Sequence, residues 1–162
     1  MIVIADTTPI NYLILIQEID VLASLYGRVI IPTAVYEELK CTVAPPLVRN
    51  WIERPPKWLE VRAPAALQNP GPAKLDPGER EAIALELAAD QIIIDDLQGR
   101  RAAERSGLTV IGTLGVLRDA SLAGLLDLTS AIDRLRHTTF HASPEILSRL
   151  LEDLGESPKG KP

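Results

Sequence analysis

Gln-Ile-Ile-Ile-Asp-Asp, residues 91–96, carries the clearest structural signal in the sequence. Three consecutive β-branched residues between polar ones are typical of a short strand buried on both faces, as in a parallel sheet. Asp95 and Asp96 follow this strand directly. We therefore expect them at the carboxyl edge of the sheet, where binding sites lie in open α/β folds. Two adjacent negative charges repel each other unless a cation or a proton compensates them.

The composition is that of an ordinary globular protein. With 162 residues, 46% of them apolar, the chain is long enough to bury a sizeable core. We expect one domain over residues 1–154, followed by a flexible tail at residues 155–162. No apolar run approaches the roughly 20 residues of a membrane span, and no signal peptide is apparent. The single cysteine, Cys41, excludes an internal disulfide and fits a cytoplasmic location.

Strand and helix patterns alternate along the chain. This alternation predicts an α/β fold of three layers, with a central parallel sheet of about four or five strands flanked by helices. Hydroxyl or carboxylate caps are expected before Pro9 and at Thr33, Asp76 and Ser143. Strands are expected at 2–5, 28–32, 58–62, 91–94 and 109–111. Helices are expected at 10–16, 19–26, 34–40, 47–53, 77–89, 97–106, 116–120, 123–128, 131–137 and 143–154.

Acidic residues recur at the ends of these strands or on the helices beside them. Asp6 closes the first strand as Asp95 closes the later one. Glu38 lies nearer the border of the apolar face of its helix than Glu37 does, so it is the better candidate for an inward carboxylate, although both could be solvated. Glu79 continues a buried stripe of its helix, or else interacts with the helix dipole.

The motifs that the sequence contains and those that it lacks limit the kinds of functional site it can form. There is no Gly-x-Gly-x-x-Gly, no Gly-x-x-x-x-Gly-Lys and no cluster of histidines or cysteines, so dinucleotide, P-loop and zinc sites have no support. Carboxylate oxygens suit Mg²⁺ or Mn²⁺. Such ions lower the pKa of a bound water and stabilise charge on a phosphoryl group, as hydrolysis of a phosphodiester requires. The net charge of −5 argues against a protein that coats nucleic acid through bulk positive charge, but permits a locally basic site.

Five motifs occur in a set order along the chain. They are Ile-Ala-Asp-Thr-Thr-Pro at 4–9, Ile-Pro-Thr-Ala-Val-Tyr-Glu-Glu-Leu at 31–39, Leu-Asp-Pro-Gly-Glu-Arg-Glu-Ala-Ile-Ala-Leu at 75–85, Ile-Ile-Ile-Asp-Asp-x-x-Gly-Arg-Arg-x-Ala at 92–103, and Val-Ile-Gly-Thr-Leu-Gly-Val-Leu at 110–117. Together they resemble PIN-domain proteins over about residues 1–130, and in particular the DUF3368 subgroup related to VapC-type toxins. The resemblance implies a PIN-like, metal-dependent ribonuclease fold.

The resemblance also implies roles for individual residues. Asp6 matches the first acidic residue of the family, and Glu38 matches its helical glutamate. Asp95 matches the acid after the later strand, and Asp96 could take that part instead. Thr8 matches a small hydroxyl residue near the first aspartate. The predicted metal ligands are the carboxylates of Asp6, Glu38, Asp95 and Asp96.

One position departs from the family pattern. Arg80 stands where the toxins commonly place an aspartate, so Glu79 or Glu81 would have to substitute for it. Thr113 is a further supporting or substrate-binding candidate after the last strand. Arg100 and Arg101 follow the acidic pair by about one helical turn; they could bind substrate phosphate or simply neutralise nearby acids.

These observations predict a Mg²⁺- or Mn²⁺-dependent endoribonuclease acting on single-stranded or structured RNA. In this interpretation Asp6, Glu38 and Asp95 hold the ion, and Glu79 or Asp96 orients water. The resemblance further implies the toxin of a type II toxin–antitoxin pair, with a cognate antitoxin. A homodimer is also expected, because the apolar segments after residue 120 could complete a dimer face, although core packing would explain them as well. No membrane association is expected, since no apolar run is long enough to span a bilayer. The main alternative is an inactive PIN-like module acting through protein or RNA contacts. A phospho-acceptor receiver domain is disfavoured because no lysine ends the last strand.

Overall fold

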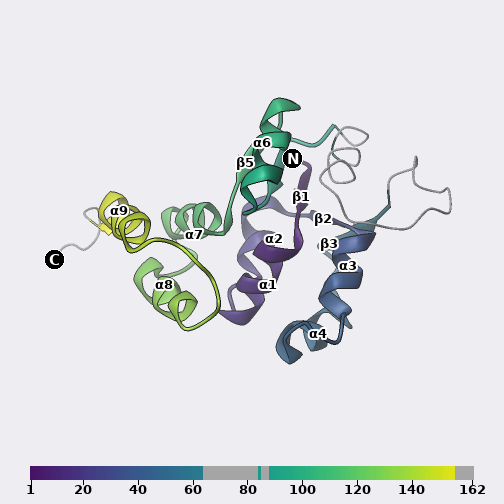
Figure 1. Cartoon of the computed structure of the whole chain (residues 1–162), viewed down its shortest axis with the longest axis horizontal. Helices are drawn as coiled ribbons and strands as arrows, with labels where there is room; N and C mark the ends of the chain where they lie inside the picture. Colours follow the sequence, from purple (N-terminus) through teal and green to yellow (C-terminus); the bar gives the residue numbers. More distant parts are fainter. Residues whose placement is uncertain (64–83, 85–87, 156–162) are drawn as a thin grey trace.

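The computed structural model describes residues 1–63, 84 and 88–155. Its five described strands form one sheet in the order β3-β2-β1-β4-β5, and every neighbouring pair is parallel (Figure 1). This confirms the predicted three-layer α/β fold with its central parallel sheet. The strands are β1 (Val3–Ala5), β2 (Val29–Pro32), β3 (Leu59–Arg62), β4 (Gln91–Ile93) and β5 (Thr109–Ile111).

The central strand β1 and its neighbour β4 are rich in β-branched residues, which favour buried strands. Ile92, Ile93 and Ile94 are all at most 1% exposed, as expected for a strand covered on both faces. In the register of the sheet Ala5 pairs with Ile93, and the backbone N–H of Asp6 donates to the carbonyl of Ile93 at 2.9 Å. The ends of β1 and β4 therefore reach the same edge of the sheet.

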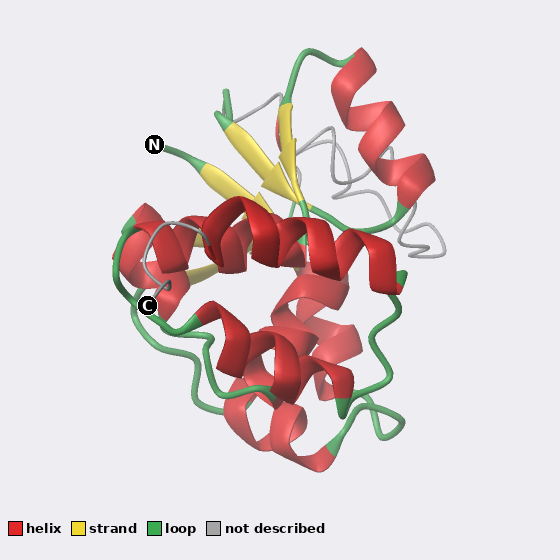
Figure 2. Cartoon of the chain, turned by 90° about the vertical axis from the view of Figure 1, so that its left-hand side faces the viewer, coloured by secondary structure: helices red, strands yellow, loops and turns green. Residues whose placement is uncertain are grey.

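Alternation along the strands sends side chains into two cores. Ile4, Ile30 and Ile92 point to one face, where they pack with Ala84 and Ala103. The intervening strand residues point to the other face, into a larger core formed with most of the described helices (Figure 2). The helices are α1 (Thr7–Leu15), α2 (Val21–Tyr26), α3 (Thr33–Lys40), α4 (Pro46–Ile52), α6 (Leu97–Arg105), α7 (Thr113–Leu122), α8 (Leu128–Arg136) and α9 (Pro144–Gly155).

The helix expected at residues 123–128 is absent from this described part of the chain. Helix α7 ends at Leu122, and Gly124 adopts a left-handed backbone with φ of 76°. The N–H of Leu125 then donates to the carbonyl of Ala120 at 2.9 Å, a bond that closes the end of the helix. Asp127 starts α8 by accepting a bond from the N–H of Ser130. The apolar residues alone predicted a helix at 123–128, but the left-handed backbone of Gly124 ends α7 instead.

Several of the expected helix starts are also wrong by a residue or more, and α7 and α8 each begin three residues earlier than expected. Helix α1 begins at Thr7, with Asp6 at the N-cap, so the hydroxyl before Pro9 is not the cap. Helix α3 begins at Thr33 itself, after Pro32. The cap at Ser143 is confirmed, because its Oγ accepts from the N–H of Ile146 at 3.2 Å. Most of the helix expected at 77–89, with Asp76, lies outside the described residues.

None of the helices in the described ranges combines the length and apolar character needed to cross a membrane.

Candidate active site at the carboxyl edge of the sheet

Asp6 and Asp95 lie at the carboxyl ends of two neighbouring strands, β1 and β4. Asp6 directly follows β1 and is only 7% exposed, because it sits between the strand end and the first turn of α1. Asp95 comes two residues after β4, the parallel neighbour of β1. The fold therefore brings to one edge two carboxylates that are almost ninety positions apart in the sequence.

Thr113 holds the carboxylate of Asp95 with two hydrogen bonds. Its backbone N–H donates to Oδ1 at 2.8 Å, and its hydroxyl Oγ1 donates to Oδ2 at 2.5 Å. Thr113 is fully buried and is the first residue of α7, so its N–H belongs to the positive end of that helix. Bonds to a charged acceptor are stronger than neutral ones. Thr113 thus positions Asp95 and, being buried, does not present its side chain to a substrate.

Gly112 allows this arrangement through its lack of a side chain. A Cβ at this position would lie 2.6 Å from Nη1 of Arg100 and 2.7 Å from Oδ1 of Asp95. The role of Gly112 was not predicted from the sequence. The available signal was a Gly-Thr pair directly after a strand, which marks a close approach of backbone to another group.

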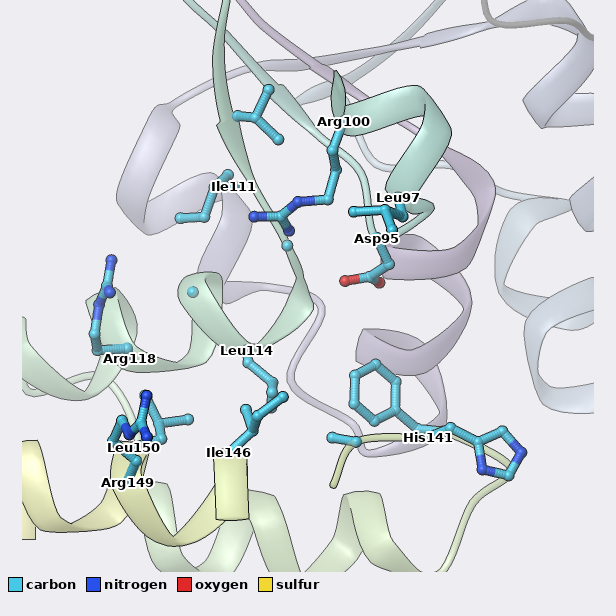
Figure 3. A pocket seen from close by; sticks show the side chains of 15 residues that line it. Asp95, Leu97, Arg100, Ile111, Leu114, Arg118, His141, Ile146, Arg149 and Leu150 are labelled. Atoms are coloured by element: carbon cyan, nitrogen blue, oxygen red, sulfur yellow. The ribbon is translucent and has the colours of Figure 1, made fainter. Parts of the chain in front are cut away.

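Asp96 has a different role from Asp95. It is exposed, and its Oδ2 accepts from the N–H of Gly99 at 2.8 Å, so it caps the N-terminus of α6. The side chain of Asp95 instead faces the cavity described below (Figure 3). The geometry therefore favours Asp95 over Asp96 as the acid of this strand.

Of the remaining predicted carboxylate and hydroxyl residues of the site, the structure describes Glu38 and Thr8. Glu38 on α3 and Thr8 on α1 are both exposed. Glu79, together with Arg80 and Glu81, lies outside the described residues. Next to Asp6, the hydroxyl of Thr7 is buried and has no hydrogen-bond partner in the described part of the chain. A buried polar atom of this kind is costly unless water or a ligand satisfies it.

The two arginines that were predicted to bind phosphate, Arg100 and Arg101, differ in their position relative to the cavity. Arg100 is partly buried, its Nη1 lies 3.4 Å from the carbonyl oxygen of Ile94, and its side chain lines the same cavity as Asp95. Arg101 is exposed and is not among the residues that line that cavity. Of these two arginines, Arg100 is therefore the one placed to meet a phosphate beside Asp95.

A groove of about 600 Å³ opens from Asp95 and Arg100 (Figure 3). We call it the Asp95 groove. It runs between the segment of β5 and α7 on one side and the segment from Phe140 into α9 on the other. Its other lining residues are Leu97, Val110, Ile111, Gly112, Leu114, Gly115, Arg118, Phe140, His141, Ala142, Ile146, Arg149 and Leu150.

The donors at the edge fit a hard divalent ion. In the described ranges, no three or more His, Cys, Asp or Glu side chains are grouped so as to hold a metal. Asp6 and Asp95, at the ends of adjacent parallel strands, are the described carboxylates that this edge offers to an ion most directly. Mg²⁺ commonly uses only one or two carboxylates and keeps several waters. The carboxylate chemistry thus suits Mg²⁺ or Mn²⁺.

Comparison with known proteins agrees with the geometry. The family model DUF3368, described as a PIN domain, matches residues 2–156. A search of curated proteins found no match. PIN domains are generally nucleases, and the parallel five-stranded sheet is consistent with their fold. Because the match covers almost the whole sequence, the chain belongs to the PIN-domain family.

Proposed function

We propose that this PIN domain is a Mg²⁺- or Mn²⁺-dependent endoribonuclease whose site is the Asp6–Asp95 edge. The observation that carries the proposal is the convergence of these two carboxylates at adjacent strand ends, with Asp95 held in place by Thr113. Carboxylates so placed are suited to hold a divalent ion against a phosphodiester.

Each residue at the edge has a distinct task in this proposal. When bound, the ion supplies Lewis-acid stabilisation of phosphoryl charge and a lowered pKa for a coordinated water. Asp6 and Asp95 would hold the ion, and Thr113 keeps Asp95 in a single orientation. Arg100 attracts the substrate phosphate toward the edge. Glu38 and Glu79 stay predicted contributors to ion binding and water orientation.

Cleavage of a mixed single-stranded RNA tests this proposal. The RNA is incubated with the wild type in Mn²⁺ and in EDTA, and with the Asp6→Asn and Asp95→Asn variants in Mn²⁺. Asp127→Asn is the matched control, because Asp127 caps α8 through the N–H of Ser130 and asparagine also caps helices well. We expect Mn²⁺-dependent cleavage that is lost in both site variants and kept in the control.

A different result would favour the alternative function, a PIN-like module that binds RNA or protein without turnover. That result is a folded wild type that binds Mn²⁺ and leaves a broad panel of RNAs intact. Cleavage that survives both site substitutions would contradict the assigned site.

The family resemblance carries one finer proposal, a toxin that pairs with an antitoxin and forms a homodimer. Its test is co-expression of the chain with any small reading frame beside its gene. Growth arrest by the chain alone, relieved by the neighbour and by Asp95→Asn, supports the toxin role. Growth unaffected by the active nuclease contradicts it. Size-exclusion chromatography with light scattering tests the homodimer.

A further inference from the structure

We propose that the Asp95 groove binds single-stranded RNA on one side of the cleavage point, with Arg118 and Arg149 contacting its phosphates. This inference rests on the proposed nuclease function, and it names the form of the substrate and the residues that hold it. Neither arginine belongs to the motifs that resemble the PIN family.

The first support is continuity with the site. Asp95 and Arg100 line the groove together with Arg118 and Arg149, so one surface leads from the proposed metal edge to the outer arginines (Figure 3). Helix α7 presents Leu114 and Arg118 four residues apart, and α9 presents Ile146 and Arg149 three residues apart. Such spacings place each pair on one face of its helix. The two helices are in contact with each other, so these faces form the walls of one channel.

The second support is the charge of the groove. The chain as a whole carries a net charge of −5, yet the described residues that line the groove include Arg100, Arg118 and Arg149 against one carboxylate, that of Asp95. Arg118 pairs with the adjacent Asp119 at 3.3 Å, but both side chains remain open to solvent, with 46% and 37% of their surface exposed. Exposed pairs of this kind are weak, so a phosphate can compete for the guanidinium.

The third support is the apolar and aromatic lining of the groove. Leu97 is 58% exposed and Ile146 is 54% exposed, and Phe140 and His141 line the same groove. A single strand offers the flat faces of its bases to such side chains, whereas a duplex keeps its bases stacked inside. The volume of about 600 Å³ falls in the range of roughly 300–1,000 Å³ seen for pockets that enclose small ligands. The groove therefore suits a short unpaired stretch better than a duplex.

Binding measured without turnover tests the inference. A short fluorescein-labelled single-stranded RNA of mixed sequence is titrated with the full chain in EDTA, at several salt concentrations, and followed by fluorescence anisotropy. The variant is the double substitution Arg118→Gln and Arg149→Gln. The matched control is Arg54→Gln, because Arg54 is an exposed arginine that does not line the groove. A double Arg→Lys variant at positions 118 and 149 keeps the charge, and thermal melts confirm that all variants fold.

We expect the double glutamine variant to lose about tenfold or more in affinity. Each lost phosphate contact should lower the slope of log K against log salt by about 0.7. The lysine variant should keep most of the affinity, the Arg54 control all of it, and the same RNA annealed to its complement should bind more weakly.

Several outcomes would overturn the inference. One is a double glutamine variant with unchanged affinity and salt slope, and another is equal binding of the duplex. A third is tight binding of an acidic amphipathic peptide that requires both arginines while RNA binding does not, which would assign the groove to a protein partner. The proposed RNA-binding groove and the proposed nuclease function can be contradicted independently of each other. Arginine-dependent binding without any cleavage contradicts only the nuclease, and cleavage with an unchanged KM in the glutamine variant contradicts only the groove.

Discussion

Replacement of Thr113 by valine tests whether the structure has identified the residue that positions Asp95. Valine has nearly the same shape as threonine and keeps the backbone N–H bond to Oδ1, but it removes the 2.5 Å bond from Oγ1 to Oδ2. The change therefore isolates one hydrogen bond to a carboxylate. Thr113→Ser is the matched control, since it retains the hydroxyl and loses only a methyl group.

The expected loss of stability follows from the burial of the two partners. A hydrogen bond to a charged group contributes about 1.5–3 kcal/mol. Thr113 is fully buried, but Asp95 is only partly buried, so water can satisfy part of the carboxylate once the hydroxyl is gone. We therefore expect Thr113→Val to lower the free energy of unfolding by about 2 kcal/mol. For a chain of this size the melting temperature should fall by about 4–8 °C.

Thr113→Val should also weaken Mn²⁺ binding, because Thr113 orients Asp95, a proposed ligand of the ion. A group that orients a metal ligand typically contributes roughly 10–100-fold to metal affinity or activity. Urea unfolding followed by tryptophan fluorescence measures the free energy of unfolding, and isothermal titration with Mn²⁺ measures the affinity for the ion. Equal unfolding free energies for the valine and serine variants, together with unchanged Mn²⁺ affinity in both, would refute the assignment of Thr113 as the positioning residue.

Three further predictions follow from single contacts. Gly112→Ala should place a methyl group against Asp95, lower the free energy of unfolding by about 1–3 kcal/mol and weaken Mn²⁺ binding in the same titrations. The matched control is Gly115→Ala, whose methyl group would crowd an isoleucine; it should lower stability and leave Mn²⁺ binding unchanged. Asp96→Ala should cost about 1 kcal/mol through loss of the helix cap and leave Mn²⁺ affinity near that of the wild type; a loss as large as that of Asp95→Asn would contradict the assignment of the two acids. Tyr26→Phe should stabilise the fold by up to about 1 kcal/mol in thermal melts, because the phenol oxygen is buried without a partner among the described residues. Burial raises the pKa of Tyr26 from 10.0 to about 12, so the wild type should lose stability from pH 10 to 12, where the unfolded chain ionises first, and the phenylalanine variant should lose less.

The sheet was predictable because its signals are local. Runs of β-branched residues such as Ile92–Ile94 require no knowledge of distant neighbours to be identified as buried strands, and helices between them require parallel pairing. The same reasoning placed Asp6 and Asp95 at one edge. Hydrophobic pattern was insufficient at residues 123–128, where the backbone of Gly124 ended the helix.

The functional detail depended on the tertiary structure. Asp95 and Asp96 are chemically identical neighbours, and only the position of Thr113 on one side and Gly99 on the other assigns them different partners. The Asp95 groove likewise joins Arg118 and Arg149, which lie on separate helices and share no motif. The sequence alone determined which residues form strands and which carboxylates end them, because those properties depend on neighbours along the chain. Which carboxylate is held toward the groove, and which arginines line it, was decided by packing between segments far apart in the sequence.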